Sequence, residues 1–335
     1  MAIKRQRKFL DSDGTVASKL LFSCLKEHER EVQFRLSKLR EYYDGEHKIL
    51  NRTFGNESIP NNKIVCNHAE YITDIATGYV FGVPITYSGN GSEELNVNFT
   101  AIDDDSHNNE LALDLSIFGR GYELLYMDNG DKPRVGLKTL SPINTFLVVD
   151  TSCEEKPMFA VHYYPNFNLD GVLENHTVEI YTEIEKLIYE APAFYNEHST
   201  LKDVDIEEHF FKGVPIIEYK NNKKSRGDFE GVLHLIDAYN QLQSDRINDK
   251  EQLVDAFLVL VGQDLGDNSE EVRKTVEYLK ENKIIELEEG ADAKWLVKSL
   301  NEDQVEILKK SLKDDIHEFS KVPCLTDENF VGIRL

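Results

Sequence analysis

The chain has 335 residues and a formal net charge of −23, from 38 Lys and Arg against 61 Asp and Glu. Hydrophobic residues make up 40% of it, with 17 Phe and 15 Tyr, which is enough for a sizeable core and excludes a wholly disordered chain. The length indicates two or three structural units, and the longest apolar run, 256–262, is far shorter than the ~20 residues that a membrane helix needs.

Apolar residues at helical spacing predict three helices in the first third of the chain, at 18–43, 63–81 and 103–118. Gly82 is expected to cap the second helix, because Pro84 prevents it from continuing. Acidic residues stand near the start of the third helix, where the helix dipole favours negative charge. We expect a loop at 50–62, which is rich in Asn, Gly and Pro, and a short strand at 85–87.

The middle of the chain is predicted to be β-rich, because it is dense in aromatic and β-branched residues. Residues 128–131 should form the turn of a hairpin, since their Asn-Gly pair supplies positive φ angles. The expected strands are 122–127, 134–139, 145–149, 158–164, 177–182, 187–190 and 214–219. A polar, basic stretch at 220–227 follows, and we place a boundary there.

Beyond this boundary the pattern predicts two long helices, 229–252 and 301–319, each with one apolar stripe and one polar face. A small mixed segment separates them, with predicted elements at 253–261, 269–280, 284–287 and 294–297. Ser269 is expected to cap the short helix. Trp295, the single tryptophan, is expected to anchor the core of this segment and not to lie in a ligand pocket.

The charge is unevenly placed, since residues 1–50 have a balance of +3, which leaves −26 for the rest. Proteins that grip nucleic acid usually display a basic face, so most of this surface should repel DNA; solubility is the simpler interpretation of such acidity. The four cysteines are far apart and form no C-x-x-C pair, which indicates reduced thiols and neither a disulfide framework nor a zinc site.

Motifs for catalysis or cofactor binding are missing from the sequence. It contains no G-x-x-x-x-G-K-[ST] loop, no G-x-S-x-G elbow and no H-E-x-x-H pair, and Gly119-Arg120-Gly121 lacks the third glycine of a dinucleotide loop. The ten histidines are scattered. The acidic run at 103–105 is consecutive on a helix, so its carboxylates should not converge on one ion. We therefore predict a protein without enzymatic activity, cofactor or metal.

Four stretches, in this order, give the chain a resemblance to a known family. They are NNKIVCN at 61–67 with GYVFGVPI at 78–85; SP at 141–142 through VD at 149–150; DAYN at 237–240 with SD at 244–245 and ND at 248–249; and FSKVP at 319–323 with DENFVG at 327–332. With them, the chain resembles the portal proteins of tailed bacteriophages, of the type found in siphophages of Gram-positive hosts. The resemblance spans roughly residues 20–332.

This resemblance implies an α+β, portal-like subunit. It would consist of an α/β wing at 1–225, a first stem helix at 226–252, a small α/β clip at 253–298, a second stem helix at 299–321 and the start of a tunnel loop at 322–335. The family's crown and long tunnel helix find no counterpart in the remaining sequence, so we expect a subunit truncated at its C-terminus.

The resemblance also implies a structural role in the portal, or connector, ring at the capsid vertex. In the family twelve subunits form this ring, which conducts double-stranded DNA during packaging and ejection without sequence-specific binding. The expected partners are further copies of the chain, the large terminase subunit, the head-completion adaptor, the scaffold and the major capsid protein. The expected location is the portal vertex of the virion, and the host cytoplasm during assembly, with no membrane contact.

Three sets of residues are candidate sites under this interpretation. A DNA conduit must not hold phosphate, so the polar stripe of the first stem helix is expected to line the channel: Asp237, Gln241, Asp245, Asn248 and Gln252. The second stem helix carries a possible basic belt, which could instead pair with stem-helix acids of a neighbour: Lys309, Lys310 and Lys313. The tunnel loop would contain Asp327, Glu328, Asn329 and Phe330.

Other classes of protein stay open at this point. The chain could be an acidic intracellular structural or interaction protein unrelated to phage, for which a plain monomer would argue, or an inactive prophage remnant. It could also be a hydrolytic enzyme that uses clustered carboxylates, for which a metal-dependent activity on nucleic acid would argue.

Overall fold

The structure, a computed structural model, describes residues 2–10, 16–55, 59–127, 133–193, 199, 201–254, 257–261, 268–282, 290, 292–296 and 302–326. The chain divides into two compact units. The first contains Met1–His47, Val65–Asp237 and Asp314–Leu335, and the second contains Lys48–Ile64 and Ala238–Lys313. Among the described residues, no helix is both long and apolar enough to cross a membrane.

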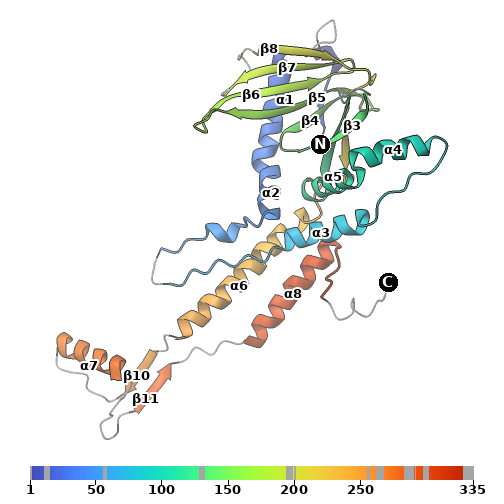
Figure 1. Cartoon of the computed structure of the whole chain (residues 1–335). Coiled ribbons are helices and arrows are strands. Elements are labelled where there is room, and N and C mark those ends of the chain that lie inside the picture. The colour runs from blue at the N-terminus through green and yellow to red at the C-terminus, as the bar shows by residue number, and fades with distance from the viewer. Residues whose placement is uncertain are drawn as a thin grey trace. The chain divides into compact units, whose positions relative to one another are not determined.

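The first unit combines five whole α-helices and parts of two more with two sheets (Figure 1). Its α-helices are α1 (Ser18–Glu31), α2 (Ser37–Tyr43), α3 (His68–Phe81), α4 (Ser92–Ile102), α5 (Asp104–Phe118), the beginning of α6 (Leu233–Val254) and the end of α8 (Glu302–Ser320). Its strands are β1 (Ile3–Arg5), β2 (Arg120–Met127), β3 (Val135–Leu140), β4 (Thr145–Asp150), β5 (Pro157–Phe167), β6 (Leu173–Tyr181), β7 (Glu185–Pro192), β8 (Lys202–Glu208) and β9 (Ile216–Lys220). The predicted α+β class is confirmed.

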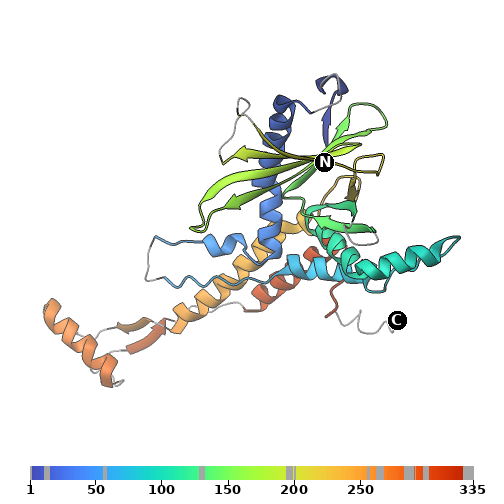
Figure 2. The ribbon, with the colours of Figure 1, turned by 45° about the horizontal axis from the view of Figure 1, so that its top comes forward.

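A six-stranded sheet with the order β1-β4-β5-β6-β7-β8 forms the centre of this unit. β1 is parallel to β4, and the other neighbours are antiparallel. Figure 1 and Figure 2 both show α1 against one face of the sheet, where Leu21 and Leu25 join Phe146 and Val161 in the core. The opposite face contributes Leu147 and other apolar residues to a second core with the three-stranded sheet β3-β2-β9.

The predicted helix at 18–43 forms, but it contains a π-helical turn, Val32–Leu36, between α1 and α2. Arg35 lies on this turn. Its guanidinium donates to both carboxylate oxygens of Glu230, at 2.9 and 2.8 Å, and to the carbonyl oxygens of Phe118 and Ser225, at 2.9 and 2.8 Å. One side chain therefore ties the turn to the end of α5 and to the segment before α6.

The second predicted helix begins later than expected, at His68. The Asn67 side chain caps it by accepting from the Glu70 amide at 3.2 Å, and residues 63–67 belong to no helix or strand. Gly82 is its C-cap, as predicted, although with a right-handed φ of −66°. The strand expected at 85–87 is wrong, since these residues form no strand and the Tyr87 ring packs on Phe99 with the centroids 4.6 Å apart.

Three elements of the first unit were not predicted. Helix α4 lies directly before α5, separated from it by Asp103 in a left-handed conformation with φ of 54°. β1 has only three residues, too few to show a period, and β8 is an edge strand whose seven residues are all exposed although Val204 and Ile206 alternate with acidic residues. The predicted hairpin is confirmed by antiparallel β2 and β3, where Met127 is opposite Val135; its turn lies outside the described residues.

The second unit contains the later part of α6, then β10 (Phe257–Val261), α7 (Ser269–Asn282), β11 (Asp292–Leu296) and the first part of α8 (Glu302–Ser320). β10 and β11 are antiparallel, with Leu258 opposite Trp295. The strand expected at 284–287 lies outside the described residues, as does the Trp295 side chain, so its role in a core stays a prediction.

Asn268, and not Ser269, caps α7. The Asn268 side-chain oxygen accepts from the Glu270 amide at 3.1 Å and from the Glu271 amide at 3.0 Å, and the prediction was one residue late. The compact units divide the chain at 237/238 and 313/314, within α6 and α8. The division into wing, stem and clip at 225, 252, 298 and 321 stays a prediction.

Candidate functional site

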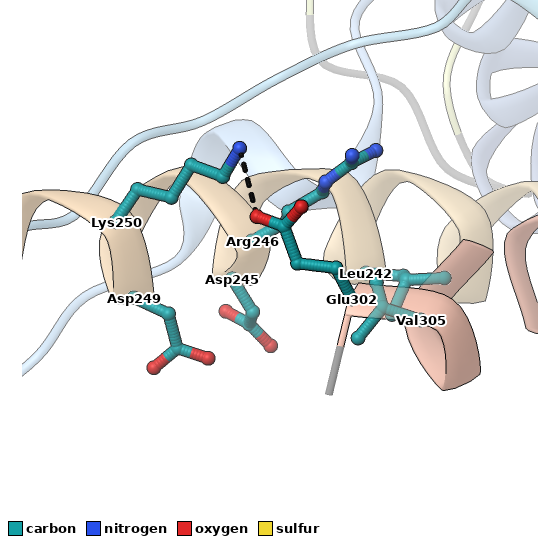
Figure 3. A pocket seen from close by; sticks show the side chains of 7 residues that line it. All are labelled: Leu242, Asp245, Arg246, Asp249, Lys250, Glu302 and Val305. Carbon is teal, nitrogen blue, oxygen red and sulfur yellow. Dashed lines mark ion pairs between the residues drawn. The ribbon is translucent and has the colours of Figure 1, made fainter. Parts of the chain in front are cut away.

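The parts of α6 and α8 that belong to the second unit are joined by two ion pairs. Arg246 contacts Glu306 at 2.6 Å, and Lys250 contacts Glu302 at 3.2 Å. Figure 3 shows the Lys250 side chain reaching Glu302, with Leu242 of α6 beside Val305 of α8. The cavity that these side chains line has a volume of only about 60 Å³, so it can hold water but no organic ligand. The arrangement joins two helices and does not form a binding pocket.

Glu306 is the most connected carboxylate of this helix pair. Desolvation opposes its ionisation, but the hydrogen bond from Lys309 at 3.4 Å and the charges of Lys309 and Arg246 hold the pKa of Glu306 below its ordinary value. It therefore stays ionised at neutral pH. Because these pairs are exposed to solvent, they contribute little to stability, and they act mainly by fixing the register of the two helices.

The opposite side of α6 is fastened to the segment 48–64. Arg52 donates to Asp245 at 2.5 Å and to the Asn62 carbonyl at 2.7 Å. Asn62 donates through its amide and its side chain to the Asn248 oxygen, at 2.8 and 2.9 Å. The polar face of α6 thus holds residues 59–64, which belong to no helix or strand.

Ser244 completes this contact. Its hydroxyl accepts from the Ile64 amide at 2.9 Å and donates to the Asn240 carbonyl at 2.8 Å, and the side chain is fully buried. The structure therefore brings together two of the four sequence stretches, the one at 61–64 and the one at 244–249. Sequence reasoning missed Arg52 and Asn62 as anchors, although the Asn-Asn pair at 61–62 was part of the resemblance.

The five residues expected to line a channel have different surroundings. Asp237, in the first unit, accepts from the Tyr42 hydroxyl at 2.6 Å. Asp245 keeps 46% of its side chain exposed beside Arg52, Asn248 is buried, and Gln241 is exposed. The side chain of Gln252 lies outside the described residues. Three of the five thus have contacts inside the chain.

The three lysines of α8 in the expected basic belt also differ in their surroundings. Lys309 is half-buried and contacts Glu306 at 3.4 Å on its own helix, Lys310 is exposed, and Lys313 is half-buried. The expected tunnel-loop residues lie outside the described part of the chain: Asp327, Glu328, Asn329 and Phe330.

The first unit contains a larger, apolar groove of about 780 Å³ between α3, α5 and residues 320–323. Tyr79 and Val80 line it and are 91% and 63% exposed. Its polar lining includes Ser116, whose hydroxyl donates to Asp228 at 2.7 Å. Among the described residues, no three His, Cys, Asp or Glu side chains are placed to share a metal ion.

Comparison with known proteins relates the chain to phage portals. It is 28% identical over 257 residues to the portal protein of Bacillus phage SPP1, covering 72% of this chain and 48% of that protein. It is 22% identical over 290 residues to the portal protein of Clostridium phage phiCD119, covering 81% of this chain and 63% of that one. The chain thus spans about half to two thirds of the length of these relatives.

Among solved structures, the chain is similar to the neck of an empty GTA particle computed with C6 symmetry. The TM-score is 0.44 at 13% identity, and the match covers 79% of this chain and 67% of that one. A neck of the native GTA particle computed with C12 symmetry gives a TM-score of 0.39 at 13% identity, covering 77% and 65%.

The family model described as "Phage portal protein, SPP1 Gp6-like" matches residues 21–334. This is almost the whole chain, and both portal relatives come from phages of Gram-positive genera, as the sequence resemblance implied. The chain belongs to the SPP1 Gp6-like family of phage portal proteins.

Proposed function

We propose that this chain is a structural subunit of a portal ring at the capsid vertex, through which double-stranded DNA passes during packaging and ejection. The family match over residues 21–334 carries the proposal, since it covers both described units. The acidic charge of −23 supports it, because a conduit that attracted phosphate would retain the duplex.

In this proposal the subunit has no catalytic role and acts through its surfaces. It forms a dodecameric ring that docks the large terminase subunit, the head-completion adaptor, the scaffold and the major capsid protein. The ring resides in the virion and is assembled in the host cytoplasm. The pairing of α6 with α8 through Arg246 and Lys250 supplies the kind of stiff support that such a ring needs.

The part of the polar stripe of α6 that the segment 48–64 leaves exposed faces the channel of this ring. Gln241 and Asp245 contribute most, because their side chains keep exposed surface, whereas Asn248 is occupied by Asn62. On α8, Lys310 is the exposed member of the basic belt, and Lys309 and Lys313 balance acids of the same or a neighbouring stem. Residues 327–330 form the tunnel loop.

The ring is tested by mass photometry and negative-stain microscopy of the purified chain. We expect closed rings that become more abundant with protein concentration. A chain that stays monomeric up to about 100 µM in moderate salt would contradict the proposed function.

The channel face is tested with Gln241→Lys, because Gln241 is exposed and this change breaks none of the described contacts. Each subunit of the ring would then offer a phosphate contact, so duplex binding should tighten and fall more steeply with salt. Gln33→Lys is the matched control, because Gln33 is exposed on the π-helical turn of the first unit. Equal DNA affinity and salt slope in both variants would show that Gln241 does not face the channel.

A further inference from the structure

The loop that follows β9 is a concentrated basic patch on an acidic protein. Residues 220–226, the basic loop, contain Lys220, Lys223, Lys224 and Arg226 and no acidic residue. Lys223, Lys224 and Arg226 are exposed, and none of the three is within ion-pair distance of a carboxylate among the described residues. Three positive charges are therefore presented to the solvent, and Lys220 adds a fourth that lies 3.7 Å from Glu218.

The backbone of the basic loop is fixed by its asparagines. The Asn222 side chain accepts from the amides of Lys224 and Arg226, at 3.0 and 3.2 Å, and donates to the Arg226 carbonyl at 2.7 Å. The Asn221 amide donates to the Gly119 carbonyl at 3.0 Å. Arg35 holds the Ser225 carbonyl at 2.8 Å. The cations project from an ordered platform, so a partner would lose little loop entropy on contact.

The opposite charge is gathered in another segment of the same unit. Residues 65–119, the acidic lobe, contain nine Asp and Glu and neither Lys nor Arg. They include α3, α4 and α5. In α4 no residue is buried, and Glu93 and Glu94 are exposed in its first turn. α4 therefore offers an accessible acidic surface that its own subunit leaves uncovered.

We propose that the basic loop docks on the acidic lobe of a second copy of this chain, and that this contact joins neighbours head to tail. The inference rests on the proposed function, because it names the interface of the ring. Different patches of one subunit meet in such a contact, and this is the type of interface that closes rings. Copies that each carry −23 repel one another overall, so a local contact of opposite charge selects one orientation of approach.

A duplex is a less suitable occupant for the basic loop. Beyond the four cations, nucleic acid bound there would meet a chain whose net charge is −23. Firm binding needs a groove or stripe of cations that follows the phosphate backbone. The acidic lobe of a neighbouring copy instead offers a negative patch that is limited in size, as the basic loop is.

The test is a charge-swap mixing experiment on the full chain. Variant one carries Lys223→Glu and Lys224→Glu in the basic loop, and variant two carries Glu93→Lys and Glu94→Lys in the acidic lobe. Alone, each variant places like charges at every contact. Assembly should then require about ten- to a hundredfold more protein, because two exposed attractions become repulsions at each interface.

An equimolar mixture of the two variants should recover assembly. In an alternating ring, each reversed loop meets a reversed lobe and each native loop meets a native lobe, so every contact is attractive again. Because the recovery of assembly needs both variants to be folded, misfolding cannot produce it.

The matched control carries Lys26→Glu and Arg30→Glu, since both residues are exposed on α1. This control should change the protein concentration needed for assembly less than about threefold.

Each result of this experiment either supports or contradicts the proposed contact between the basic loop and the acidic lobe. Wild-type rings with unaltered assembly of both variants, or a mixture that fails to recover, would overturn the inference and leave the proposed function standing. Unaltered assembly with weakened duplex binding in variant one would assign the basic loop to nucleic acid instead. A wild-type chain that never assembles would overturn the ring and this interface together.

Discussion

His28 should make the first unit sensitive to mild acid. It is 2% exposed in the core between α1 and the six-stranded sheet. Its Nε2–H donates to the Pro142 carbonyl and its Nδ1 accepts from the Tyr163 hydroxyl, both at 3.0 Å. Burial and, next, the charge of Arg120 lower the pKa of His28 from 6.5 to about 4. The neutral imidazole is therefore the form that fits this site.

The magnitude follows from the two pKa values. The unfolded chain takes up a proton at this residue near pH 6.5, whereas the folded chain takes it up only near pH 4, so stability is complete above pH 6.5 and is lost as the pH falls. Between pH 7.5 and pH 5 the difference in proton binding removes about 2 kcal/mol from the free energy of unfolding. That is a large share of the 5–15 kcal/mol by which domains are typically stable.

Urea unfolding followed by far-UV circular dichroism measures this effect at pH 7.5 and 5. His28→Gln should cost stability at both values, but its loss between them should be about 2 kcal/mol smaller than in the wild type. His234→Gln is the matched control, because His234 is exposed on α6, and it should leave the wild-type slope unchanged. Equal pH slopes in His28→Gln and the wild type would refute the reasoning.

Three further substitutions test the first unit by the same unfolding assay. Desolvation raises the pKa of Asp114 to about 7, so its contribution to stability is present below pH 4 and is lost as the pH rises to 7. Asp114→Asn should raise the free energy of unfolding by about 4 kcal/mol at pH 8 and by less than about 1 kcal/mol at pH 4. No gain at pH 8 would mean that water solvates this carboxylate. Gly119→Ala should lower the free energy of unfolding by about 3 kcal/mol, because Gly119 has a φ of +79° and a Cβ there would lie 2.4 Å from the Ser225 backbone. A loss below about 1 kcal/mol would show that the loop containing Ser225 can move aside. Arg35→Lys should lower the free energy of unfolding by about 2–4 kcal/mol, since one ammonium cannot replace a guanidinium shared by Glu230 and two carbonyls. An unchanged stability would show that the π-helical turn forms without these hydrogen bonds.

The sequence alone was sufficient for most of the secondary structure. The apolar stripes of α1, α6 and α8 and the dense β-branched runs of β4 to β6 are local patterns, and the structure confirms these elements within a few residues. The family could be inferred in the same way, because it depends on the order of short motifs and not on their contacts.

The errors occurred where solvent exposure or a single side chain decides. β8 and α4 each have a short apolar pattern, Val204 with Ile206 and Leu95 with Phe99 and Ile102, but neither element contains a buried residue, so these patterns do not reflect packing in a core. Asn67 and Asn268 set the starts of α3 and α7 through one side-chain oxygen each, which composition cannot locate.

The sequence also determined that α6 has a polar stripe, but only the tertiary structure decided what that stripe contacts. Asn248 receives its hydrogen bonds from Asn62, 186 positions earlier, and Asp245 receives Arg52 from 193 positions away. The sequence does not show whether a polar side chain on a helix binds water or a backbone amide from a distant part of the chain. Burial of unpaired amides is costly, so the irregular segment 59–64 needs these partners, and the fold alone brings them to it.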